Sequence, residues 1–270
     1  MTVEAVVQQV ALVSDAPGWL QALVASLPRS LRKADTVSTA DLVLVDGEGQ
    51  WPQRLSASLA QGARKLVLVE PGYADPAAVR SVIDAANAVA ADCTIVEALP
   101  DNPALEGFRN LLATGFDEMV IYASGPISLE GMALMHLRLL RALNCKTLQF
   151  DKPASVTQAF VVDGSAKLGT ADMRLRLSGS LAPDPSRLSV AAYSGGSTAH
   201  LEWSAGAEAD PIKVSLADSS GLRLLPAIHE GGHRQGLRTI LRGQCHGIGT
   251  GTLRDLADDI AMARTIIDAP

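Results

Sequence analysis

Short apolar runs alternate with amphipathic segments along the first half of the chain. Residues 41–46 (DLVLVD) and 65–70 (KLVLVE) are almost continuously apolar, which is typical of strands buried on both faces of a parallel sheet. The segments between such runs carry apolar residues at helical spacing. The pattern predicts strands at 6–14, 41–46, 65–70 and 94–97, and helices from near Trp19, near Leu55, at Asp75-Pro76 and at Asn102-Pro103. This alternation indicates βαβ units and a parallel sheet.

The second half of the chain changes to a period of two. After a further strand at 119–123, Ser128 is expected to cap a long helix over 129–143, and two helices close the chain at 233–242 and from 253. Between them, alternating strands separated by turn residues are expected at 157–163, 173–178, 188–193, 199–203 and 213–217. The sequence therefore predicts an α/β protein. A reduced Rossmann-like parallel sheet in 1–118 is followed by an α+β domain in 119–270, with a mostly antiparallel open sheet.

Composition narrows the classes of partner. Among 270 residues, 47% are hydrophobic and 19% charged, and the net charge is −6; no basic cluster suggests nucleic acid, and no apolar stretch is long enough to cross a membrane. Cys93, Cys145 and Cys245 lie far apart without C-x-x-C spacing, which favours a reducing compartment. The N-terminus lacks the basic region of a signal peptide. We therefore expect a cytoplasmic protein without nucleic-acid or membrane partners.

Four features occur in a characteristic order, and the first is the strand at 6–14 that leads into a helix. Leu66-Val-Leu-Val-Glu70-Pro71 ends a strand in an acid and a proline, and Gly131-Met-Ala-Leu-Met-His136 places a histidine on a helix. The closing segments are 237–243 and 251–260. In this order the chain resembles the Gfo/Idh/MocA oxidoreductases, the family of glucose–fructose oxidoreductase and inositol dehydrogenase. The resemblance implies NAD or NADP as cofactor, a sugar-like or polyol-like substrate, and a homodimer or higher homo-oligomer.

The resemblance also assigns site residues. It places Gly18, Glu70 and Pro71 at the cofactor and makes His136 the catalytic residue, which assists removal of a hydroxyl proton. From the residues alone, His136 is equally a hydrogen-bonded core imidazole, because it lies on the apolar stripe of its helix. We expect its side chain to be directed toward Glu70 and Pro71.

The chain departs from the family pattern at the positions that carry chemistry. The turn from Ser14 to Trp19 (SDAPGW) has one glycine, where a dinucleotide-binding turn uses three to let backbone N–H groups reach the pyrophosphate. Asp15 would repel phosphate, and no clear acid follows about 20 residues on to bind the ribose. The family's lysine between Glu70 and Pro71 is absent, and Met132 replaces the acid four residues before His136. The segment 30–40 is too short for a complete strand-helix-strand unit.

Two hypotheses follow from these departures. The chain is either a divergent NAD(P)-dependent oxidoreductase, or a non-catalytic binding, regulatory or subunit-type protein that keeps the fold without the dinucleotide site. Any dinucleotide affinity is expected to be weak.

Other motifs have simpler interpretations. His229-Glu-Gly-Gly-His233 matches the zinc motif H-E-x-x-H, with Asp255, Asp258 or Asp259 as a conceivable third ligand. Adjacent glycines disfavour the helix that the motif needs, so a loop before a helix, with a phosphate or sugar contact, is preferred and no metal is expected. We interpret 151–153 (DKP) as a solvated turn, 194–197 (SGGS) as a hairpin turn and Cys93 as a core residue.

The antiparallel sheet bears on assembly. The helices predicted in this half of the chain can cover only one face of the sheet, so we expect a second subunit to cover the other face. We expect this second subunit to cover strands that carry Leu188, Val190, Leu201 and Trp203.

Overall fold

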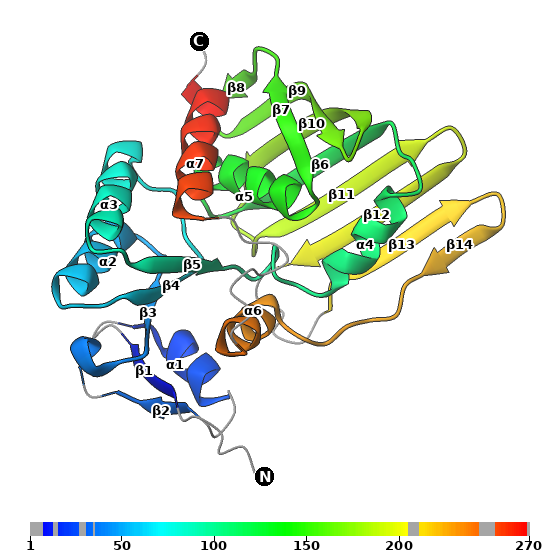
Figure 1. The fold of residues 1–270 in the computed structure, drawn as a ribbon. Helices are drawn as coiled ribbons and strands as arrows, with labels where there is room; N and C mark the ends of the chain where they lie inside the picture. Colours follow the sequence, from blue (N-terminus) through cyan, green and yellow to red (C-terminus); the bar gives the residue numbers. More distant parts are fainter. Residues whose placement is uncertain are drawn as a thin grey trace, which may run out of the picture. The chain divides into compact units, whose positions relative to one another are not determined.

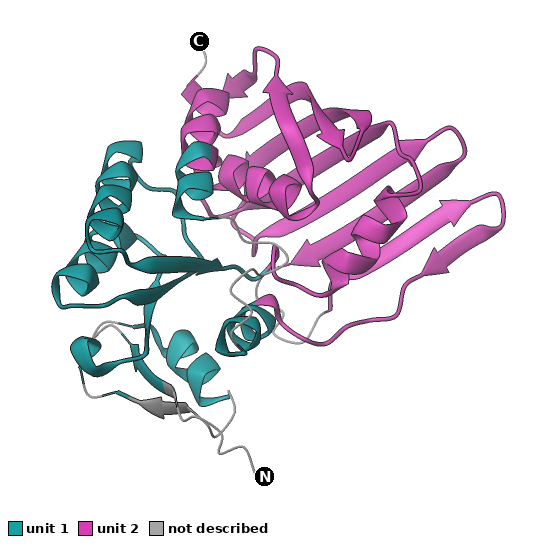
Figure 2. Ribbon diagram, in the orientation of Figure 1, with its two compact units in different colours: residues 1–98, 233–258 teal, residues 99–232, 259–270 magenta. Residues whose placement is uncertain are grey.

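The computed structural model describes residues 8–12, 16–26, 31–34, 36–204, 211–242 and 252–268. The chain forms two compact units, residues 1–98 with 233–258 and residues 99–232 with 259–270 (Figure 2). The sequence suggested a boundary near residue 118. The units instead divide after Ala98, because helix α4 (Ala104–Leu112) packs on β12 (Ser197–Ser204) and β13 (Lys213–Asp218) of the second unit. No helix in the described ranges is both long and apolar enough to cross a membrane.

The described part of the first unit contains a five-stranded parallel sheet in the order β2-β1-β3-β4-β5 (Figure 1). Its strands are β1 (Gln8–Leu12), β2 (Leu31–Lys33), β3 (Leu42–Asp46), β4 (Lys65–Val69) and β5 (Asp92–Val96). The described residues between β2 and β3 form a single 3₁₀ turn, η1 (Val37–Thr39). The expected reduction of this part of the sheet is therefore confirmed, although the short strand β2 was not predicted.

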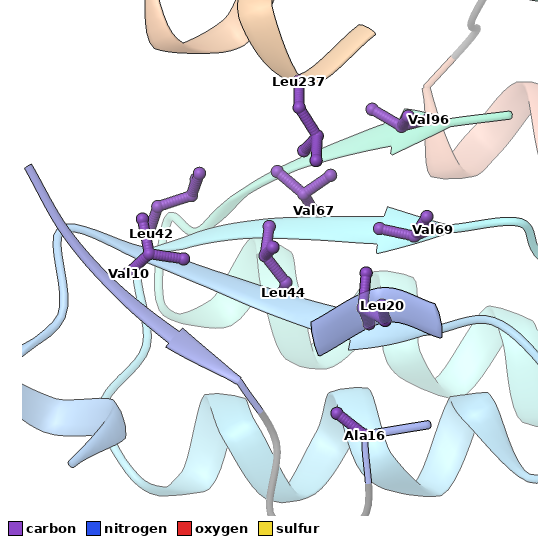
Figure 3. Close-up of a cluster of buried hydrophobic side chains, with 9 residues drawn as sticks. All are labelled: Val10, Ala16, Leu20, Leu42, Leu44, Val67, Val69, Val96 and Leu237. Atoms are coloured by element: carbon purple, nitrogen blue, oxygen red, sulfur yellow. The ribbon is translucent and has the colours of Figure 1, made fainter. Parts of the chain in front are cut away.

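Helices cover both faces of this sheet, which explains its continuous apolar strands. They are α1 (Gly18–Ala25), α2 (Trp51–Ala60), α3 (Pro76–Ala88) and α6 (Gly232–Leu241). Figure 3 shows one face, where Leu20 of α1 and Leu237 of α6 meet side chains of β1, β3, β4 and β5. The intervening residues, among them Val43 and Leu68, are also buried and point to the other face. On that face α2 packs on β3 and on α3.

The described part of the second unit contains a nine-stranded, mostly antiparallel sheet, as the sequence predicted. Its path is β14-β13-β12-β11-β6-β10-β9-β7, and β8 pairs with β9. The strands not yet given are β6 (Glu118–Gly125), β7 (Cys145–Phe150), β8 (Ala154–Val156), β9 (Ala159–Leu168), β10 (Ala171–Leu181), β11 (Arg187–Ser194) and β14 (Gly221–Leu224). Strand β6 runs parallel to β10 and antiparallel to β11.

Helix α5 (Leu129–Ala142) packs on β6, β7 and β10 of this sheet. Leu188, Val190 and Leu201 are at most 2% exposed, so these side chains do not lie on the uncovered face. A period of two shows which residues share a face but not which face meets the helices. On the opposite face, Tyr122 and Val161 flank Ser178 in one row of the register, and they are 44% and 42% exposed.

Helix caps follow the sequence closely. The side chains of Asp75 and Ser128 accept hydrogen bonds from the backbone N–H groups of the first turns of α3 and α5. Thr252 and Asp255 bond each other's backbone N–H groups at the start of α7 (Leu253–Asp268). These caps confirm the predicted helix starts, because their side chains satisfy N–H groups that lack partners inside the helix.

Candidate functional site

The carboxyl ends of β3 and β4 are packed closely against each other. The N–H of Gly47, directly after β3, donates to Val69 at 2.7 Å, and the N–H of Gly72 donates back to Gly47 at 2.9 Å. A Cβ atom on Gly47 would lie 2.5 Å from the carbonyl carbon of Glu70, so only glycine fits here. Glu70 itself has a φ of 55°. Such a conformation is strained for a residue with a side chain and marks positions that the surrounding structure must hold in place.

Three side chains meet above these strand ends. The Nε2 atom of His233, at the start of α6, lies 2.6 Å from Oε2 of Glu70, and the same oxygen accepts the N–H of Ala98 at 2.7 Å. The indole of Trp19 stacks on the His233 imidazole, with ring centroids 5.2 Å apart and an interplanar angle of 28°. Trp19 is 40% exposed, and the side chains of His233 and Glu70 are 25% and 48% exposed. We call Trp19, His233 and Glu70 the edge cluster.

Topology explains why this position matters. The chain leaves β1 for β2 on one side and then returns to β3 on the other, so the strand order reverses between β1 and β3. In open α/β sheets, ligands bind outside the carboxyl ends of the strands at this switch point. Trp19 belongs to the helix after β1, whereas Glu70 follows β4, with β3 between them. The edge cluster therefore bridges the ligand-binding edge of this sheet.

Acidic side chains stand at the carboxyl ends of the three adjacent strands β3, β4 and β5. They are Asp46, Glu70 and Glu97, of which Asp46 and Glu97 are 8% and 5% exposed. Arg54 pairs with Asp46 at 3.3 Å and donates to its carbonyl oxygen at 2.9 Å. Each of these carboxylates contributes negative potential at this edge, which opposes the binding of a phosphate dianion.

The residues assigned to a cofactor all lie in the first unit. Gly18 is the first residue of α1. Apart from its chain neighbours and the backbone of its own helix, no heavy atom lies within 4 Å of a Cβ built there. Pro71 is buried beside Glu70. Ser14 and Asp15 lie outside the described residues. The structure thus brings Glu70 together with Trp19, the neighbour of Gly18, through His233, which the sequence did not associate with either.

His136 is fully buried in the second unit. It is 0% exposed, its ring lies 5.8 Å from that of Phe160, and neither ring nitrogen has a hydrogen-bond partner in the part of the chain that the structure describes. Burial lowers the pKa of its imidazole from 6.5 to about 3. The hydrogen-bonded interpretation was therefore wrong, and so low a pKa makes the imidazole a weak base at neutral pH. Its approach to Glu70 and Pro71 joins residues of different units and stays a prediction.

The zinc-like motif is not helical. Residues 229–231 are irregular and α6 begins at Gly232, so the preferred loop interpretation is confirmed. Within the described ranges, no group of three His, Cys, Asp or Glu side chains could hold a metal ion. Asp259 instead bonds Arg138 and Arg141. Lys152 is exposed, as expected of a turn, and desolvation raises the pKa of the Cys93 thiol to about 12.

Sequence reasoning missed the role of His233, which it treated only as a doubtful metal ligand. It also treated Trp19 only as an obstacle. Signals for both were present, since each residue stands in the first turn of a helix on the ligand-binding side of a parallel sheet. The short strand β2 gives a further signal, because Asp35 follows it in the sequence, but Asp35 lies outside the described residues.

Comparison with known proteins finds no matching family model and no matching curated protein. Solved structures do match over nearly the full length. The UDP-N-acetylglucosamine 3-dehydrogenase of Acidithiobacillus ferrooxidans has a TM-score of 0.70 at 10% identity, over 97% of each chain. The dehydrogenase MviM of Clostridium difficile has a TM-score of 0.71 at 10% identity, over 97% of this chain and 99% of that one. The chain has the fold of the Gfo/Idh/MocA oxidoreductases.

A third structure with this fold holds a cofactor. It is a 3-ketoreductase of Actinomadura kijaniata in complex with NADP and TDP-benzene, with a TM-score of 0.70 at 10% identity over 96% of each chain. In this chain the residues do not fit a dinucleotide well. The edge cluster bridges the switch point, and Pro17, the residue before α1, has no N–H to offer a phosphate.

Proposed function

We propose that this chain is a binding protein with the Gfo/Idh/MocA oxidoreductase fold, which holds a small molecule at the carboxyl edge of its parallel sheet without transferring hydride to a nicotinamide. The observation that carries the proposal is the edge cluster. Side chains from α1, from the residue directly after β4 and from α6 stand where this type of fold binds ligands.

Electrostatics and backbone support the same proposal. Pro17, the residue before α1, has no N–H group with which to bind a pyrophosphate at the start of this helix. Asp15 stands two residues before Pro17 in the sequence, and a like charge 4 Å from a phosphate costs about 1 to 4 kcal/mol, depending on the effective dielectric. We therefore expect dissociation constants for NAD(H) and NADP(H) no tighter than roughly millimolar, or about −4 kcal/mol.

Isothermal titration with NADH and NADPH tests this function, with thermal unfolding as a second readout. No saturation below millimolar concentration and no rise in the unfolding temperature are expected. A low-micromolar dissociation constant would contradict the proposal, because ligand at about 100 times that constant stabilises a fold by about 2.7 kcal/mol.

A second candidate is an NAD(P)-dependent oxidoreductase acting on a sugar-like or polyol-like substrate. The observation that favours it is the full-length likeness to dehydrogenases and to a ketoreductase in complex with NADP. The same titration decides between the two, because only the second candidate requires a nicotinamide cofactor to bind.

A further inference from the structure

We propose that Trp19 is a stacking platform for a planar heteroaromatic ligand with an N–H donor, and that the His233 imidazole occupies this place until the ligand displaces it. The inference deepens the proposed function and rests on it, since it names the ligand class of the same edge. The geometry that carries it is the stack of two rings next to a carboxylate.

The exposure of Trp19 separates it from the core tryptophan of the same unit. Trp51 is 0% exposed and its indole N–H donates to the carbonyl of Gly72 at 3.0 Å, whereas Trp19 is 40% exposed at the start of α1. Large aromatic side chains left at a ligand-binding edge offer a flat apolar surface on which rings stack. His233 already uses that surface, at a centroid distance of 5.2 Å.

The contacts of His233 define what can replace it. Its imidazole presents a flat ring to Trp19 and a nitrogen to the Glu70 carboxylate at 2.6 Å. A carboxylate accepts hydrogen bonds, so this nitrogen donates. A competing ligand must therefore offer a planar ring and an N–H group at its edge, as amino-substituted purines and pyrimidines do. The N–H of Ala98 donates to the same carboxylate oxygen at 2.7 Å and so helps to hold the Glu70 side chain at this position.

The negative charges at this edge further limit the class of ligand. The carboxylates at the carboxyl ends of β3, β4 and β5 disfavour phosphate groups at this edge. A neutral nucleoside satisfies the ring and donor requirements without that repulsion. His233 stands in the first turn of α6 with its side chain 25% exposed, so a rotation about its side-chain bonds can move the imidazole out of the stack.

Titration of the full chain with adenosine, followed by tryptophan fluorescence and calorimetry, tests the inference. Removing the internal competitor by His233→Ala, or by His233→Ser in case alanine destabilises the start of α6, should tighten adenosine binding by about 10-fold. Trp19→Leu should abolish it. His229→Ala, which changes an exposed histidine just before the same helix, should bind like the unchanged protein.

Purine riboside, which has the same ring system without the amino group, is the matched ligand control. It should bind roughly 10-fold more weakly than adenosine, and Glu70→Gln should narrow this difference. Absence of saturable adenosine binding to the folded His233→Ala and His233→Ser proteins would overturn the inference, as would unchanged binding to Trp19→Leu. Micromolar NADH binding by the unchanged protein would instead overturn the proposed function, so the two failures are distinguishable.

Discussion

His136 shows how burial alone determines the protonation state of a residue. Its imidazole has no partner among the described side chains, and burial lowers its pKa from 6.5 to about 3. The unfolded chain takes up a proton below pH 6.5, while the folded chain does so only near pH 3. Stability contributed by the neutral imidazole is therefore complete above pH 6.5 and is lost as the pH falls toward 3.

This coupling predicts that acid lowers the stability of the fold and that replacing His136 makes this loss smaller. Between pH 7 and pH 4 the titration of His136 should remove about 3 kcal/mol of the free energy of unfolding. His136→Leu should show a loss smaller by about that amount in urea unfolding at the two pH values. An equal loss in both proteins would mean that His136 is hydrated or bonded in solution.

At the scale of elements, a buried ion cluster joins α5 to α7. Asp259 lies 3.1 Å from Arg138 and 2.6 Å from Arg141, and Arg138 and Asp259 are each 3% exposed at the side chain. Asp259→Asn would remove the negative charge that Asp259 supplies to the buried Arg138 and to Arg141, and breaking a buried ion pair typically costs about 3 to 5 kcal/mol.

Chemical unfolding of Asp259→Asn measures this cost. The neighbouring Asp258→Asn is the matched control, because Asp258 is exposed on the same helix and should change stability by no more than about 0.5 kcal/mol. Similar effects of the two substitutions would show that the cluster contributes little to stability.

At the scale of the whole molecule, the open face of the large sheet predicts self-association. Tyr122, Val161 and Tyr193 are each more than 40% exposed there, and the register places the tyrosines on the same side of β6 and β11. Exposed aromatic residues on a broad sheet face are typical of subunit interfaces. Light scattering at micromolar concentration should give a dimer or a higher homo-oligomer.

Tyr193→Glu should shift that equilibrium toward the monomer, because it would bury a charge in the interface. Arg80→Glu on α3, an exposed position of the other unit, should not. A monomer mass for the unchanged protein would contradict the predicted assembly.

The sequence by itself determined the features that depend on neighbouring residues. The buried strands β3 and β4, the caps at Asp75 and Ser128, and the change of period after residue 146 all follow from local spacing and local hydrogen bonds. It also indicated the fold, because the order of these elements is itself a sequence property.

Only the tertiary structure decided the rest, because the contacts involved are not local. Which side of the large sheet meets α5, and therefore where Leu188 and Val190 point, depends on packing rather than on period. The edge cluster joins Glu70 to His233 across 163 positions of sequence, and His136 lost its expected partner through burial among side chains from other elements. Composition and local spacing do not show which distant residues a parallel sheet brings to one edge.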